Sequence, residues 1–247
     1  MQDSTKKALK ILEKDRVRNA NIINFMNHYP VERIHIYKES VLVQGRSDQL
    51  WTYISSDKKE ELEGLVKEVP FEIRHFAILE DWMLPLVVGK RKILWKLSCL
   101  KLYFPEEKEL PENKVPMEPL PVSATEYIYD HSSYKQYTSR EYIQERIEKG
   151  TGLGIYQGDQ LVAWVLTHDD GALGFLTVLP HYQGKGYAKE VTVAAIKELR
   201  KKGAPVFVHI EPDNPTSLAL SRKLGFVDDR RIHWIKVGKA VENPGRD

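Results

Sequence analysis

Apolar and polar positions alternate regularly in two regions of the chain and lose this pattern between them. Residues 105–121 hold five of the 13 prolines and many charged residues, but almost no apolar periodicity, which is typical of a connector. We therefore expect an N-terminal mixed α/β domain at 1–104, a proline-rich linker at 105–121 and a C-terminal domain at 122–247. The N-terminal domain carries no catalytic motif.

The C-terminal region has the pattern of a sheet followed by helices. Thr138, with Glu141 three residues on, predicts a capping box that opens a helix. Short apolar or alternating segments separated by turn sequences then predict an antiparallel meander. After the meander, two segments with helical periodicity alternate with two further strand-like segments. The expected strands are 154–156, 160–167, 173–179, 206–211 and 231–237, and the expected helices are 138–149, 184–202 and 215–224.

Composition and charge exclude several classes of function. The net charge is only +2, with 37 basic residues scattered among 35 acidic ones, so we expect no nucleic-acid partner. Cys99 is the only cysteine and no CxxC or HExxH spacing occurs, so we expect no metal. No stretch approaches the roughly 20 apolar residues of a membrane span. We expect a cytoplasmic protein with no membrane partner.

Residues 183–188 lie where a predicted strand gives way to a helix. The first backbone amides of a helix have no internal partner and carry partial positive charge, so a turn of small residues there can hold a phosphate group. Gly184 and Gly186 would allow close approach, and Lys185 adds charge. The alternative is a tight strand-to-helix connection without a ligand.

The neighbouring motifs give this turn its family resemblance. Val178-Leu179-Pro180 precedes it, and Asn214-x-x-Ser217 and Leu224-Gly225-Phe226 follow some thirty residues later. This arrangement resembles the GNAT superfamily of N-acetyltransferases over residues 137–237. Within the superfamily, the glycine N-acyltransferases are the most similar, and they also carry an extra N-terminal domain.

The resemblance implies an α/β (α+β) fold, with a mixed, mostly antiparallel twisted sheet flanked by helices in the C-terminal domain. The smaller N-terminal α/β domain would shape the acceptor groove or be a degenerate GNAT-like copy. The co-substrate would be acetyl-CoA or another short acyl-CoA, bound without a metal. Asn214, which precedes Pro215, is equally suited to cap a helix. The implied cofactor-binding residues are Leu176, Thr177, Val178, Gln183, Gly184, Lys185, Gly186, Tyr187, Ala188, Asn214 and Ser217.

Two side chains are candidates for the chemistry. Positions 207, 209 and 211 share one face of the expected strand, opposite an apolar face. His209 lies where the ribosomal-protein alanine acetyltransferases place their catalytic glutamate, and histidine accepts protons near neutral pH. It is our first candidate for the general base, and Glu211 is the second, as base or as a carboxylate that orients the amine. His209 could equally be a strand histidine bonded to a neighbour.

Two departures from the family pattern affect the mechanism. Ala172 stands where the glycine N-acyltransferases have a catalytic glutamate, and Ser221 stands where many GNAT enzymes have a tyrosine that acts as general acid. We expect N-acyl transfer from a CoA thioester to a primary amine of a small molecule or amino acid. A protein or peptide N-acetyltransferase and a weakly catalytic CoA-binding sensor are the alternatives, and a homodimer stays open.

Overall fold

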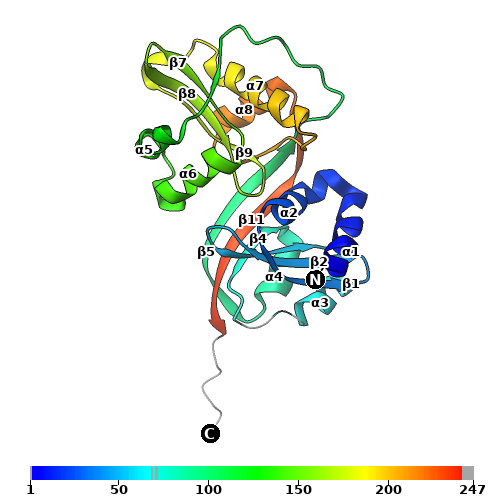
Figure 1. The fold of residues 1–247 in the computed structure, drawn as a ribbon. Coiled ribbons are helices and arrows are strands. Elements are labelled where there is room, and N and C mark those ends of the chain that lie inside the picture. Colours follow the sequence, from blue (N-terminus) through cyan, green and yellow to red (C-terminus); the bar gives the residue numbers. More distant parts are fainter. Residues whose placement is uncertain (1, 68, 70–71, 241–247) are drawn as a thin grey trace. The chain divides into compact units, whose positions relative to one another are not determined.

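The computed structural model describes residues 2–67, 69 and 72–240, which form two compact units (Figure 1). Unit 1 holds the described residues of Met1–Lys101 and Asp229–Asp247, and unit 2 is Leu102–Asp228. Strands β5 (Arg91–Tyr103) and β11 (Val227–Ala240) each contribute residues to both units.

These boundaries differ from the expected domains. We assigned 231–237 to the C-terminal domain, but β11 pairs antiparallel with β4 (His75–Leu79) of unit 1, with His233 opposite Leu79. The proline-rich segment 105–121 belongs to unit 2, where Asn113 Nδ2 donates to the Glu190 carbonyl at 2.9 Å. Apolar periodicity specifies a strand and not its partner, which is why the sequence placed β11 with its neighbours in the chain. Residues 241–247 of the expected domain lie outside the described residues.

Unit 1 is a sheet with a pair of helices on each face. Alternation along β2 sends Val41 and Val43 into a core with α1 and α2, and Leu42 into a second core with α3. The sheet order is β1-β2-β3-β4-β11-β5, and β3 and β4 run parallel. Besides β4, β5 and β11, the elements are α1 (Gln2–Leu12), α2 (Arg16–His28), β1 (Val31–Tyr37), β2 (Ser40–Arg46), β3 (Leu50–Ser55), α3 (Lys59–Lys67) and α4 (Leu84–Val88).

Unit 2 contains the predicted meander, in the order β10-β9-β8-β7-β6. Strands β7, β8 and β9 pair antiparallel, and β10 pairs parallel with β9, with Val208 opposite Leu173. The mixed α/β fold predicted from the sequence is confirmed. The elements are β6 (Glu118–Pro119), α5 (Thr125–Asp130), α6 (Arg140–Lys149), β7 (Gly152–Gln157), β8 (Gln160–Thr167), β9 (Leu173–Val178), α7 (Tyr187–Lys201), β10 (Phe207–Ile210) and α8 (Pro215–Leu224). Short 3-10 turns lie at Glu13–Asp15, Asp81–Met83, Val122–Ala124, Lys135–Tyr137 and Pro180–Tyr182.

One order of elements occurs twice along the chain. Two helices, a three-stranded meander, a helix, a strand, a helix and a strand make up α1 to β5, and the same succession makes up α5 to β11. In both runs the third meander strand pairs parallel with the strand that follows the next helix. The chain is therefore built from two topologically equivalent halves.

Candidate acyl-CoA site

The turn before α7 is shaped by two glycines in the left-handed region. Gly184 has φ +76° and Gly186 has φ +83°, and a Cβ added to either would meet no atom within 4 Å. The glycines are therefore required by the backbone conformation and not by crowding. All of residues 183–186 are exposed, so this side of the turn is open.

The helix that follows begins without a side-chain cap. Gly186 is the N-cap residue, and no side chain accepts a hydrogen bond from the first amides of α7. The expected start at 184 was three residues early, because the left-handed glycines cannot belong to the helix. A 15-residue helix with uncapped amides behind an open turn is suited to bind an anion such as a pyrophosphate.

Two other residues of the turn, Gln183 and Lys185, contact residues that precede it in the chain. Gln183 Nε2 donates to the Val178 carbonyl at 3.2 Å, and Lys185 Nζ lies 4.9 Å from the ring centre of Tyr182. Leu176, Thr177 and Val178 are half-buried along β9, as are Tyr187 and Ala188 at the start of α7. The structure thus brings the predicted pantetheine strand and the predicted pyrophosphate turn into one continuous segment.

Asn214 and Ser217 form a helix cap. The Asn214 side-chain oxygen accepts a hydrogen bond from Ser217 N at 3.0 Å, at the start of α8. This is the capping role that the sequence allowed as an alternative.

His209 lies on β10 beside an aspartate that precedes β9. His209 Nδ1 is 3.8 Å from Asp170 Oδ2, and the two side chains are 8% and 4% exposed. The parallel pairing of β9 with β10 causes this proximity, since it sets the turn before β9 next to β10. Asp170 Oδ1 also accepts a hydrogen bond from Ala172 N at 3.1 Å. Glu211 follows β10 and is half-buried.

Asp170 was missed by the sequence analysis. The run Asp169-Asp170-Gly171 is one of the turn sequences that separate the predicted strands of the meander, and it does form the turn between β8 and β9. Two adjacent aspartates exceed what such a turn requires, and this surplus was the available signal for a further role.

Comparison with known proteins now identifies the fold. The family model described as FR47-like protein matches residues 152–235. A GCN5-related N-acetyltransferase-like protein from Streptococcus suis superposes with a TM-score of 0.56 at 13% identity, covering 96% of this chain and 100% of that one. The chain has the GNAT fold. A Drosophila protein of known crystal structure is also similar, with a TM-score of 0.77 at 16% identity over 96% of this chain and 97% of that one.

Part of the chain is also similar in sequence to a curated acetyltransferase. The mycothiol acetyltransferase of Nocardiopsis dassonvillei is 30% identical over 115 residues, which are 39% of this chain. The match spans about a third of that relative's own length, 35%. The FR47-like match runs from β7 into β11, within the residues 137–237 whose sequence resembles the GNAT superfamily.

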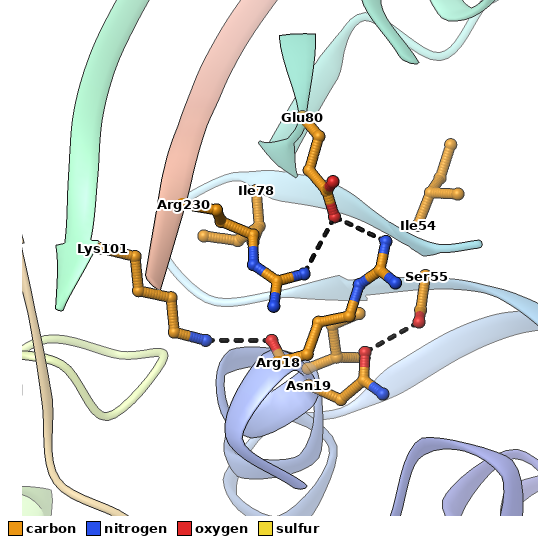
Figure 2. A pocket seen from close by; sticks show the side chains of 9 residues that line it. Arg18, Asn19, Ile54, Ser55, Ile78, Glu80, Lys101 and Arg230 are labelled. Carbon is orange, nitrogen blue, oxygen red and sulfur yellow. Dashed lines mark hydrogen bonds and ion pairs between the residues drawn. The ribbon is translucent and has the colours of Figure 1, made fainter. Parts of the chain in front are cut away.

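A second polar site lies within unit 1. Figure 2 shows Arg18 and Arg230 directed at Glu80, whose Oε1 lies 2.5 Å from Arg18 Nη2 and 3.1 Å from Arg230 Nη1. The fully buried Lys101 donates to the Val17 and Arg18 carbonyls of α2. Glu80 pairs with both guanidinium groups, and Lys101 is satisfied by backbone carbonyls, so we interpret these residues as a structural network.

The described part of the chain offers neither a cluster of metal ligands nor a membrane-spanning helix. Residues 2–67, 69 and 72–240 contain no group of three histidine, cysteine, aspartate or glutamate side chains that could hold a metal ion. Within the same ranges, every helix is too short or too polar to span a bilayer.

Proposed function

We propose that unit 2 binds acetyl-CoA, or another short acyl-CoA, and transfers its acyl group to a primary amine. The observation that carries this proposal is the uncapped start of α7 behind Gly184 and Gly186. The GNAT fold and the similarity to a mycothiol acetyltransferase support acetyl transfer. In this proposal residues 183–188 bind the pyrophosphate and residues 176–178 contact the pantetheine arm.

The proposed reaction needs one base. The amine nitrogen attacks the thioester carbonyl carbon, the C–N bond forms, the C–S bond breaks, and CoA leaves as a thiolate. His209 accepts the proton that the amine loses, and Asp170 stabilises the imidazolium that results. Water protonates the thiolate, since Ser221 replaces the tyrosine acid of many GNAT enzymes.

The proposed acceptor is a small molecule or amino acid with an α-amine, as for the glycine N-acyltransferases. At pH 7, deprotonating a lysine amine of pKa about 10.4 costs about 4.6 kcal/mol, whereas the α-amine of a peptide, near pKa 8, costs only about 1.4 kcal/mol. A site with a single histidine base suits the amine that is easier to deprotonate. The balanced charge of the chain supports a small-molecule partner over nucleic acid.

Further parts of the proposal concern the whole chain. We place the protein in the cytoplasm, without a membrane partner, and keep a homodimer open. The repeated order of elements supports the interpretation of the N-terminal half as a degenerate GNAT-like copy.

The test combines binding and turnover. Calorimetry with acetyl-CoA should give one strong site, and thiol detection should report CoA release with amino acids, polyamines or peptides as acceptors. Binding without release on any acceptor would contradict acyl transfer and support a sensor. Fastest release with lysine side chains would contradict the α-amine acceptor.

A further inference from the structure

The turn that carries Asp170 is held by a tyrosine of α6. The Tyr142 hydroxyl donates to Asp169 Oδ1 at 3.0 Å and accepts from Asp169 N at 3.1 Å. It also lies 3.3 Å from His168 Nδ1. A phenol has one donor and two acceptor positions, so these contacts engage its full hydrogen-bonding capacity.

The Tyr142 hydroxyl acts here as a neutral donor. Burial, reinforced by the Asp169 carboxylate, raises the pKa of Tyr142 well above its ordinary value of 10.0. The phenol therefore stays protonated at neutral pH and keeps its hydrogen bond to Asp169. It is not suited to be a base.

Two hydrogen bonds connect Tyr142 to Asp170. Asp169 Oδ1 accepts from the Tyr142 hydroxyl and also from Asp170 N at 3.1 Å. The turn is then closed by His168 N, which donates to the Ala172 carbonyl at 2.8 Å. A shift of the Tyr142 hydroxyl would therefore act directly on the backbone that carries the Asp170 carboxylate.

The ring of Tyr142 packs independently of its hydroxyl. It lies 6.2 Å from the ring of Phe175 and 6.4 Å from that of His168, and the last two rings are 4.8 Å apart. Replacing Tyr142 by phenylalanine keeps this packing and removes only the hydrogen bonds. The variant should therefore fold.

We propose that Tyr142 is a positioning residue for the pair His209 and Asp170: it fixes the turn 168–172 so that the Asp170 carboxylate faces the imidazole. The catalytic consequence rests on the proposed function, whereas the effect on His209 itself does not. The Asp170 carboxylate lies within ion-pair distance of His209, at 3.8 Å. Other titratable or charged groups near the pair are Asp169 and His168 on the turn, Tyr142, Glu145 and Arg146 on α6, and Glu211 after β10.

The direct test is an NMR titration of the His209 ring, assigned with His209→Gln. A carboxylate at this distance raises the pKa of a histidine by favouring its charged form. We expect Asp170→Asn to lower the His209 pKa relative to the wild type, and Tyr142→Phe to lower it by a smaller amount. Tyr127→Phe, in the same unit, should leave it unchanged. An unaltered His209 titration in Tyr142→Phe would overturn the proposal.

A pair of substitutions at Asp169 provides the rescue. Asp169→Asn keeps an oxygen that can accept from Tyr142 and from Asp170 N, so its His209 titration should stay closer to the wild type than that of Asp169→Ala. Equal titrations in the two variants would count against the proposal.

Activity gives a second readout. If an acceptor is found, Tyr142→Phe should lower kcat roughly ten-fold while the KM for acetyl-CoA stays unchanged, because residues 183–188 are untouched. An equal loss of acetyl-CoA binding would assign Tyr142 a general structural role and overturn the proposal. If no amine is acylated, the proposed function fails, and the NMR titration still decides the role of Tyr142.

Discussion

Asp170 Oδ2 lies 3.8 Å from His209 Nδ1, and each side chain is less than a tenth exposed. A buried carboxylate next to an imidazole favours the protonated ring, which is what a general base must become during the reaction. The pair therefore gives the predicted base a partner that the sequence analysis did not name.

The first prediction concerns this pair. Asp170→Asn should lower kcat/KM about ten-fold and move the acid limb of its pH profile to lower pH, because the imidazolium loses its carboxylate. His209→Gln should lower kcat/KM at least about a hundred-fold. CoA release measured from about pH 5.5 to about pH 9 resolves both effects.

Glu211→Gln is the matched control for the base. It should keep most of the activity, because its side chain is the second candidate and His209 is the first. If Glu211→Gln abolished turnover and His209→Gln did not, Glu211 would be the base.

A second prediction compares two glycines at opposite ends of α7. Gly186→Ala should weaken acetyl-CoA binding at least about ten-fold, since a left-handed alanine costs roughly 1–2 kcal/mol and shifts the first amides of the helix. Gly203, after the helix, has φ +64° and equally open surroundings, so Gly203→Ala carries similar strain away from the turn. Calorimetry should show normal affinity for Gly203→Ala, and equal losses would contradict a phosphate site at the turn.

The third prediction concerns the network in unit 1. Glu80→Ala leaves Arg18 and Arg230 without their shared carboxylate and should lower the free energy of unfolding by about 2 kcal/mol. Glu32→Ala removes an exposed ion pair with Arg46 and should cost at most about 1 kcal/mol. Urea unfolding followed by circular dichroism distinguishes the two, and equal effects would show that the Glu80 network adds no stability.

The fourth prediction is a pH dependence of stability. Glu61 is buried, which raises its pKa, but hydrogen bonds from Ser40 and Glu39 and the charge of Lys58 outweigh this, so its pKa is lowered from 4.5. A carboxylate with a depressed folded pKa stabilises the fold above its unfolded pKa, and this contribution is lost as the pH falls below about 4.5.

Glu61→Gln checks this sign. The variant should be less stable than the wild type at pH 7, and the gap should narrow as the pH falls through the folded pKa of Glu61. Thermal unfolding at pH 7 and at about pH 3.5 measures it. A gap that stays constant with pH would show that the charge of Glu61 contributes no stability.

Local signals in the sequence predicted individual elements well. The strand 160–167 and the helix 215–224 occur with the predicted bounds, because alternation and the Asn-Pro start are strong signals over short ranges. The helix expected after Thr138 is capped instead by Ser139, whose hydroxyl accepts from Tyr142 N. Both residue types make good caps, so the sequence could not decide between neighbours.

Relationships between distant residues were not accessible in the same way. The contact of His209 with Asp170 joins residues 39 positions apart through the parallel pairing of β9 and β10. Likewise, β11 pairs with β4, which lies more than a hundred residues earlier in the chain. Neither pairing leaves a periodic trace in the chain, so the sequence predicted the face of His209 but neither its partner nor the unit boundaries.

The return of β11 to unit 1 affects how the protein folds during synthesis. Domains generally fold from the N-terminus as they leave the ribosome, but the sheet of unit 1 stays incomplete until residues 229–240 are made. The uninterrupted stretch 102–228 of unit 2 emerges before them. Unit 1 is therefore the first unit to begin synthesis and the last to be completed.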